Sequence, residues 1–235
     1  MTQEKPFAIT LDVGSSLANR TGSWRTLRPV YVNRLPPCNA KCPAGEKCRD
    51  WLFLAQSGDY EGAWKEIVED NPFPAVMGRV CYHTCQTACN RGDLDEPVGI
   101  NAVERFLGDH ALKLGWKLPQ PAEEKGKRIL VVGAGLAAAY YLSLMGHKAT
   151  VYEKRKRLGG MMRYGIPKYR LPREVLDEEI ARIEALGVEF EFGREVSDLA
   201  AEMKAGGYAA AVIGAGASLA HRAYIPAGDA AHIMD

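Results

Sequence analysis

The stretch Arg128-Ile-Leu-Val-Val-Gly-Ala-Gly135 decides the fold of the second half of this 235-residue chain. Its unbroken apolar run is typical of a strand that is buried on both faces of a parallel sheet. Two glycines follow the run, as in turns that let a dinucleotide pyrophosphate rest on the N-terminus of a helix. We therefore expect Gly133, Ala134 and Gly135 to form a nucleotide-binding turn.

Strand and helix patterns alternate on the C-terminal side of this turn. Expected strands cover residues 128–132, 149–153, 188–192 and 209–213, and expected helices cover 136–145 and 172–186. This alternation of strands and helices predicts an α/β fold with a doubly wound parallel sheet. Glu153, with Lys154 beside it, ends the second strand 20 residues after Gly133, where a carboxylate that binds a ribose hydroxyl is expected. The acidic residues 177–179 are expected to form a solvated helix face.

The first half is expected to be mainly helical. Residues 1–37 are polar and proline-containing and indicate an extended arm, and residues 38–116 form the predicted helical domain. Short amphipathic stretches cover 51–55 and 63–68, and residues 100–116 repeat apolar positions with a helical period. A polar, proline-broken linker at 117–127 separates this domain from residues 128–235.

All six cysteines lie in the predicted helical domain, spaced Cys38-x3-Cys42-x5-Cys48 and Cys81-x3-Cys85-x3-Cys89. No export signal precedes them, so clustered thiols indicate a metal site rather than disulfides. Residues four apart share one helix face, so the last three thiols would form a stripe aimed at one centre. A [4Fe–4S] cluster fits two successive Cys-x3-Cys steps better than zinc, its main rival. Unligated buried thiols are the third alternative.

The number of thiols limits the number of clusters. Two cubanes need about eight ligands, so six cysteines imply one cluster with spare thiols or two clusters with other ligands as well.

Charge and hydropathy exclude other classes of protein. Lys+Arg 30 against Asp+Glu 29 gives a net charge of +1, so nothing indicates nucleic-acid binding. The uncharged run at 129–146 approaches the length of a membrane span, but a strand, a glycine turn and a helix explain it better. We expect a cytoplasmic protein without a membrane span.

Four longer sequence motifs resemble those of the glutamate synthase small-subunit family. This family also includes ferredoxin:NADP oxidoreductase subunits and one half of dihydropyrimidine dehydrogenase. They are Gly-Ser-Trp-Arg-Thr at 22–26 and the sequences at 37–45, 71–81 and 98–108. The resemblance implies an iron–sulfur domain, an FAD domain and then an NADPH domain. It further implies a subunit that moves electrons between NAD(P)H, FAD and a [4Fe–4S] cluster, to or from a partner oxidoreductase. The alternative is a non-catalytic module that docks onto a larger redox complex and has a degenerate flavin site.

The resemblance also implies a set of metal ligands. Fuller members of the family have two more cysteines just upstream of position 38, and this sequence has none there, so a second cluster is doubtful. Glu104 matches a position that supplies a side-chain oxygen in relatives, and it is a candidate fourth ligand beside Cys42, Cys81 and Cys85. Cys48 falls at a usually apolar position and is expected to pack in the core, with a role as a spare ligand as the alternative. The matched positions are Cys38, Cys42, Cys81, Cys85, Cys89 and Glu104.

For the flavin, residues 158–172 resemble the family's flavin-contacting loop. The expected contacts from this resemblance are Gly159, Gly160, Ile166, Pro167 and, after the last strand, Gly214. The family reads Gly-x-Gly-Pro-x-Gly-Leu at the first turn, whereas Gly135 runs directly into Leu136 here. Either the sequence is three residues short at this point or the phosphate cradle is altered. No second fingerprint of the NADPH type follows, so this chain alone is expected not to bind NADPH in the family manner.

Overall fold

A computed structural model describes residues 35–120, 123 and 126–216 of the chain. The expected extended arm therefore lies outside the described residues, apart from its last three. Pro37, the final residue of that expected arm, is instead the first residue of a helix, as its ring favours.

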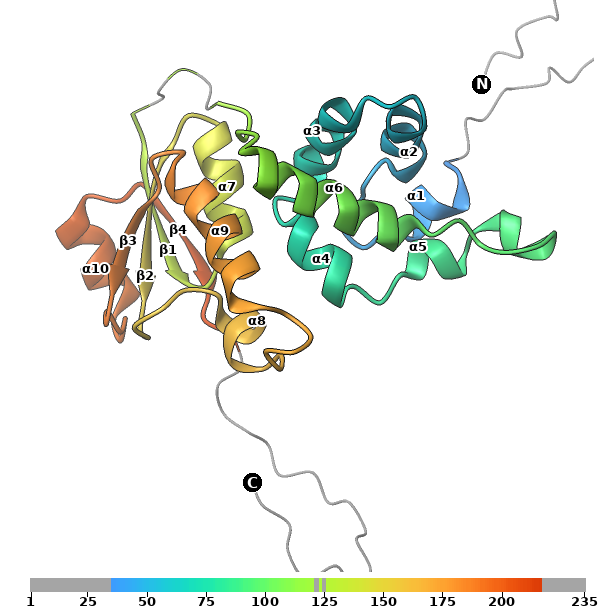
Figure 1. Cartoon of the computed structure of the whole chain (residues 1–235). Helices are drawn as coiled ribbons and strands as arrows, with labels where there is room; N and C mark the ends of the chain where they lie inside the picture. Colours follow the sequence, from blue (N-terminus) through green and yellow to red (C-terminus); the bar gives the residue numbers. More distant parts are fainter. Residues whose placement is uncertain (1–34, 121–122, 124–125, 217–235) are drawn as a thin grey trace, which may run out of the picture. The chain divides into compact units, whose positions relative to one another are not determined.

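The first half is helical, as predicted (Figure 1). Its helices are α1 (Pro37–Lys41), α2 (Cys48–Gln56), α3 (Tyr60–Asp70), α4 (Pro74–Val80), α5 (Thr84–Thr87), the 3-10 helix η3 (Asn90–Asp93) and α6 (Ile100–Leu114). The Asp59 side chain caps α3 by accepting a hydrogen bond from the backbone N–H of Gly62. Gly115 has a left-handed φ of 68° and ends α6 two residues before the predicted end.

The expected stripe of three thiols on one helix is wrong. Cys81 is extended (φ −61°, ψ 149°) and ends α4, and His83 has a left-handed φ of 57° just before α5. The Thr84 hydroxyl donates to the Lys41 carbonyl at 2.8 Å, which holds the start of α5 against the end of α1. The three thiols therefore come from three separate turns of the chain.

Helices α4 and α6 cross at two glycines with no side chain between their backbones. A Cβ built on Gly78 would lie 2.5 Å from the Arg105 backbone, and a Cβ on Gly108 would lie 2.3 Å from the Ala75 nitrogen. Only glycine permits this approach. The crossing fixes α4, which ends at Cys81, against α6, which carries Glu104.

The second half contains a four-stranded parallel sheet in the order β3-β2-β1-β4, which confirms the predicted α/β class. The strands are β1 (Arg128–Gly133), β2 (Lys148–Glu153), β3 (Glu189–Phe192) and β4 (Ala210–Gly214). The helices are α7 (Leu136–Leu144), α8 (Gly160–Tyr164), α9 (Arg173–Glu184) and α10 (Leu199–Gly206).

Helices cover both faces of this sheet, as the doubly wound arrangement requires (Figure 1). Val131 and Val151 pack with α7 and α9 on one face, whereas Leu130 and Tyr152 pack with α10 on the other. Neighbouring residues of a strand point to opposite faces, so the continuous apolar run of β1 supplies both layers.

The helical half and the sheet half share one hydrophobic core. Trp64 and Val68 of α3 belong to the same buried cluster as Tyr140 of α7. The Tyr140 hydroxyl donates to the Val68 carbonyl at 2.7 Å, and both groups are buried. The domain boundary at 117–127 stays a prediction. The residues on its two sides pack against each other in this shared core.

The prediction of a solvated face at 177–179 is wrong for Glu179. Its side chain has no exposed surface, because it follows Leu176 on the face of α9 that is turned to the core. Its Oε1 accepts a hydrogen bond from the backbone N–H of Ala75 at 2.9 Å. Asp177 and Glu178 are exposed, as predicted.

Among the described residues, no helix is both long and apolar enough to cross a membrane.

Candidate functional site

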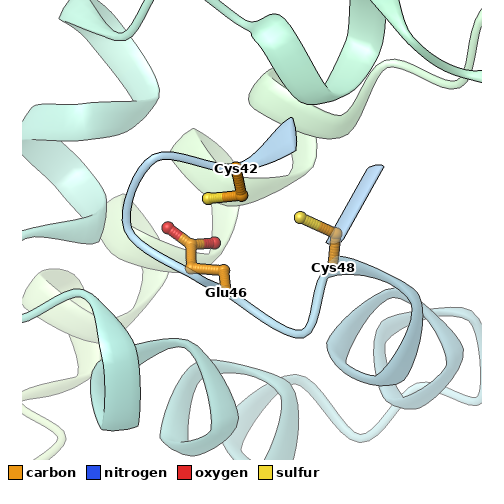
Figure 2. Close-up of side chains that lie close together, drawn as sticks. All are labelled: Cys42, Glu46 and Cys48. Atoms are coloured by element: carbon orange, nitrogen blue, oxygen red, sulfur yellow. The ribbon is translucent and has the colours of Figure 1, made fainter. Parts of the chain in front are cut away.

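The loop between α1 and α2 gathers two thiols and a carboxylate. Cys42 follows α1, Cys48 is the first residue of α2, and Gly45 between them has a φ of 79° that turns the loop back on itself. Figure 2 shows the side chains of Cys42, Glu46 and Cys48 pointing toward one another. One ligand atom from each lies within 4.8 Å of those of the other two.

Cys48 packs in the core, as expected, but it also belongs to this group of thiols. It is 1% exposed and lies in an apolar cluster with Trp51, Ile67 and Leu107. The neighbouring thiols of Cys42 and Cys85 raise the pKa of its own thiol. It also lies 3.9 Å from the carbonyl oxygen of Cys38. Cys48 therefore links residues from both halves of the cysteine sequence.

Asn71 connects two buried carboxylates beside the thiols. Its amide nitrogen donates to Oε1 of Glu46 at 2.9 Å and to Oε1 of Glu104 at 3.0 Å. Its own oxygen accepts from the backbone N–H of Phe73 at 3.0 Å, which fixes the orientation of the amide. The Oε2 oxygens of Glu46 and Glu104 lie outside this bridge and are available to a ligand.

These acidic groups shift one another's pKa values. Hydrogen bonding from Cys48 lowers the pKa of Cys42 and of Cys85 below that of an ordinary thiol. Burial, and then the charge of Cys42, raises the pKa of Glu46. Burial, and then the charge of Glu46, raises the pKa of Glu104. The site thus concentrates groups that become anions where water is scarce, and a bound cation would stabilise their charged forms.

The positive charge of Lys47, the lysine nearest to the site in the sequence, does not pair with the acidic groups of the site. Lys47 follows Glu46, but its ammonium group lies 2.9 Å from Glu66 and 2.7 Å from Glu69. Thiolates suit an iron–sulfur cluster, so the donors present fit a [4Fe–4S] group.

The remaining predicted ligands fall into two places. Burial raises the pKa of Cys81, and the charges of Glu104, Cys85 and Cys42 raise it further, so Cys81 lies within electrostatic range of this group. Cys38 and Cys89 instead both line a largely apolar cavity of about 650 Å³ between α2 and α6. The charges of Glu104, Cys85 and Cys42 thus act on Cys81, and those of Cys89 and Cys85 act on Cys38, which together with Cys89 also lines the neighbouring cavity.

Two residues of this site were missed by sequence reasoning. Glu46 continues the spacing of Cys38-x3-Cys42 by four more positions, and this signal could have identified it. Asn71 lies 25 residues from Glu46 and 33 from Glu104. No local pattern marks Asn71 as their common donor.

The nucleotide-type turn adopts the backbone that its glycines permit. Gly133 ends β1 with a φ of 85°, and a Cβ there would lie 2.5 Å from the Gly214 carbonyl oxygen. A Cβ on Gly135 would lie 2.7 Å from Cγ1 of Val131. The turns after β1 and β4 therefore touch, and Gly133, Ala134, Gly135 and Gly214 meet at the carboxyl edge of the sheet, the usual ligand-binding edge.

The short fingerprint changes the space in front of this turn. Helix α7 begins at Leu136, directly after Gly135, and the fully buried Ala139 lies one turn further along. A Cβ on Gly160 would lie 2.8 Å from the Cβ of Ala134, so the start of α8 is packed against the turn. Helix α7 forms although the third glycine of the family pattern is missing. The turn after β1 and the start of α8, however, are separated by only a narrow gap.

Glu153 and Lys154 lie at the predicted end of β2. Glu153 is 6% exposed, and its Oε1 accepts from the backbone N–H of Arg155 at 2.9 Å. The Lys154 ammonium group pairs with Glu195 on the surface. Glu153 is thus held by the turn after β2, and Lys154 is engaged in a different contact.

The expected flavin loop forms a turn and the short helix α8. Gly159 and Gly160 have φ values of 114° and 45°, so both need glycine. Ile166 packs against the shared core, and its carbonyl accepts from the Arg173 guanidinium at 2.7 Å, whereas Pro167 is exposed. The loop is tied to the N-terminus of α9.

Two protein families match parts of the chain, one in each half. Residues 28–116 match the family model described as dihydropyrimidine dehydrogenase domain II, 4Fe–4S cluster. Residues 131–177 match an NAD(P)-binding Rossmann-like domain. The chain therefore consists of a helical domain of this iron–sulfur type followed by a Rossmann-like domain.

Curated relatives of the chain include subunits of redox enzymes, which confirms the resemblance to the glutamate synthase small-subunit family. The small chain of NADPH glutamate synthase of Mycobacterium tuberculosis is 35% identical over 82% of this chain and 40% of its own length. The PreT subunit of NAD-dependent dihydropyrimidine dehydrogenase of Escherichia coli K12 is 36% identical over 69% of this chain and 40% of its length. The beta subunit of NADP(+)-dependent formate dehydrogenase of Moorella thermoacetica is 37% identical over 65% and 25%. The chain thus spans about two fifths or less of these relatives.

Proposed function

We propose that this chain is an electron-transfer subunit that carries one [4Fe–4S] cluster, bound by Cys42, Cys81, Cys85 and Glu104. The observation that supports it most is the buried group of thiols and carboxylates, bridged by Asn71 and surrounded by apolar side chains. A bound cluster supplies one-electron chemistry, and the protein sets its potential through burial and hydrogen bonds.

The residues of the chain have distinct roles in this proposal. Cys42, Cys81 and Cys85 bind through sulfur and Glu104 through oxygen. Asn71 orients Glu104, and Trp51 and Leu107 exclude water from the site. Cys38 and Cys89 lie at the neighbouring cavity and are not required for this cluster.

The turn at Gly133–Gly135, Glu153 with Lys154, and the loop from Gly159 to Pro167 would hold FAD in the same proposal. A flavin exchanges a hydride with NAD(P)H and single electrons with iron–sulfur centres. The names of the relatives include NADPH, NAD and NADP(+), and each describes a chain or subunit, which supports a nicotinamide nucleotide and a partner oxidoreductase. The expected cytoplasmic location belongs to this proposal as well.

Anaerobic purification with metal and sulfide analysis tests the cluster. We expect about four iron and four sulfide per chain, the stoichiometry of one cubane, and an electron paramagnetic resonance signal after reduction with dithionite. Cys85→Ala is expected to lose the iron, whereas the matched variant Cys89→Ala keeps it. Zinc without sulfide in the wild-type chain would overturn the proposal.

The second candidate is a docking module of a redox complex without a flavin. The narrow gap between Ala134 and Gly160 favours it, because a pyrophosphate needs room beside the turn. An absorption band near 450 nm, about the usual position for bound oxidised flavin, distinguishes the two. Its presence in the purified chain supports the electron-transfer subunit, and its absence after incubation with FAD supports the module.

A further inference from the structure

The donor atoms of Cys42, Glu46 and Cys48 lie closer together than ligands on separate irons of a cluster. All three lie within 4.8 Å of one another. Around one tetrahedral ion with bonds of about 2.0–2.3 Å, neighbouring donors are roughly 3.3–3.8 Å apart. The ligands of a cubane bind different irons and so stand further apart than donors that share one ion. The geometry of these three residues therefore fits a single metal ion.

The loop that carries the three donors is held in place by its surroundings. Glu46 is 5% exposed, and its Oε1 is fixed by Asn71, which leaves Oε2 outside that hydrogen bond. Cys48 is fixed by its place in the apolar cluster and at the start of α2.

We propose that Cys42, Glu46 and Cys48 bind one tetrahedral divalent cation of the zinc class in the chain that lacks its cluster. Two thiolates and a carboxylate are a ligand set that such ions accept. Cys42 is also a ligand of the proposed cluster, so the ion and the cluster exclude one another. This exclusion, but not the ion site itself, rests on the proposed function.

Cobalt titration of the full-length, cluster-free chain under anaerobic, reducing conditions tests the site. Co²⁺ reports tetrahedral geometry through its visible bands and thiolate binding through charge-transfer absorption. We expect one tightly bound Co²⁺ per chain. Cys48→Val, which keeps an apolar side chain in the core, and Glu46→Gln, which keeps an acceptor for Asn71, should each weaken binding at least about tenfold, the least that losing even an outer partner costs.

Cys89→Val is the matched control, because Cys89 lies outside the trio, and it should bind Co²⁺ as the wild type does. Far-ultraviolet circular dichroism verifies that each variant is folded. If both Cys48→Val and Glu46→Gln bind Co²⁺ as tightly as the wild type, the site is wrong.

Reconstitution with iron and sulfide, with and without one equivalent of Zn²⁺, tests the exclusion. Zinc should lower the cluster yield of the wild type and leave that of Cys48→Val unchanged. Full cluster yield in wild-type chain that still holds its zinc would refute the exclusion. A chain that binds Co²⁺ but never assembles a cluster would retain the ion site and contradict the proposed function instead.

Discussion

Glu179 is a buried carboxyl group whose protonation affects stability. Burial raises its pKa from 4.5 to about 7. The folded chain therefore holds this proton more tightly than the unfolded chain does. Between these two pKa values, the free energy of unfolding falls as the pH rises. The group thus favours the folded state below pH 4.5 and opposes it most above pH 7.

We predict that Glu179→Gln stabilises the protein at pH 8, by up to about 3 kcal/mol, and has little effect at pH 4.5. The glutamine carbonyl still accepts from the Ala75 N–H, and the buried charge is removed. Urea denaturation at the two pH values measures the difference. The exposed Glu178→Gln serves as control. An equal effect of Glu179→Gln at both pH values would contradict the raised pKa.

The side chain of Asn71 makes three hydrogen bonds that hold the candidate site together. Asn71→Ala leaves two carboxylate oxygens and the Phe73 N–H without their partner in a buried place. Each such group costs about 1–3 kcal/mol, so we expect the cluster-free chain to lose at least about 2 kcal/mol of unfolding free energy. Asn101→Ala removes only a 3.4 Å contact to the Met77 carbonyl and should lose much less. Equal losses in both variants, measured by urea denaturation, would refute this role.

Among single residues, the sequence identified those whose role is indicated by the residues next to them along the chain. Gly133 follows an apolar strand, and Cys85 lies in a repeated spacing. Asn71 escaped because its partners Glu46 and Glu104 lie 25 and 33 residues away, whereas Glu46 does continue the cysteine spacing and was overlooked. Glu179 was misassigned because its acidic neighbours are exposed, and only its contact with α4 shows that it is buried.

The crossing of α4 and α6 is the contact between elements that the site depends on. Gly108→Ala would place a Cβ 2.3 Å from the Ala75 nitrogen, so the helices must separate. Overpacking of this kind costs typically about 1–3 kcal/mol, and the shift also moves Glu104 away from Cys81. We expect lower unfolding free energy and less bound iron, measured on the same preparation.

Gly99→Ala is the matched control for this prediction. Gly99 precedes α6 with a φ of −71°, and the nearest atom to its built Cβ is 3.8 Å away. It should keep the iron content and stability of the wild type. If Gly108→Ala behaves in the same way, the helices are not constrained at their crossing.

The predicted elements are those with a strong pattern of their own. The strand at 128–132 and the helix at 100–116 were identified from apolar runs and periods, with ends moved only by Gly133 and Gly115. Helix α10 was missed because its alanines and glycine give no apolar period, and none of its residues is buried. The thiol stripe failed because spacing alone does not show that His83 leaves the helical conformation.

In the whole molecule, the shared core predicts that the described part of the chain unfolds as one unit. The buried cluster runs from Trp64 and Val68 through Tyr140 to the sheet. Circular dichroism and tryptophan fluorescence should therefore report one urea midpoint. Tyr140→Phe removes the bond to the Val68 carbonyl and should lower that midpoint, with about 0.5–1.5 kcal/mol lost.

The partly buried Tyr141, which lies beside Tyr140 on α7 and donates no such bond among the described contacts, gives the control Tyr141→Phe. Two separated transitions, one for each half, would show that the halves are independent. Coincident transitions in the wild type that separate in Tyr140→Phe would instead locate their coupling at this bond.

The glycine crossing of α4 and α6 also makes this protein a suitable frame for redesign. Because backbone meets backbone at Gly78 and Gly108, the distance between the two helices does not depend on how flexible side chains settle. An engineer can therefore exchange the proposed donor at position 104, for instance by Glu104→Cys, without altering the spacing of the two helices. Variants made in this way would isolate the effect of donor chemistry on redox potential from the effect of geometry.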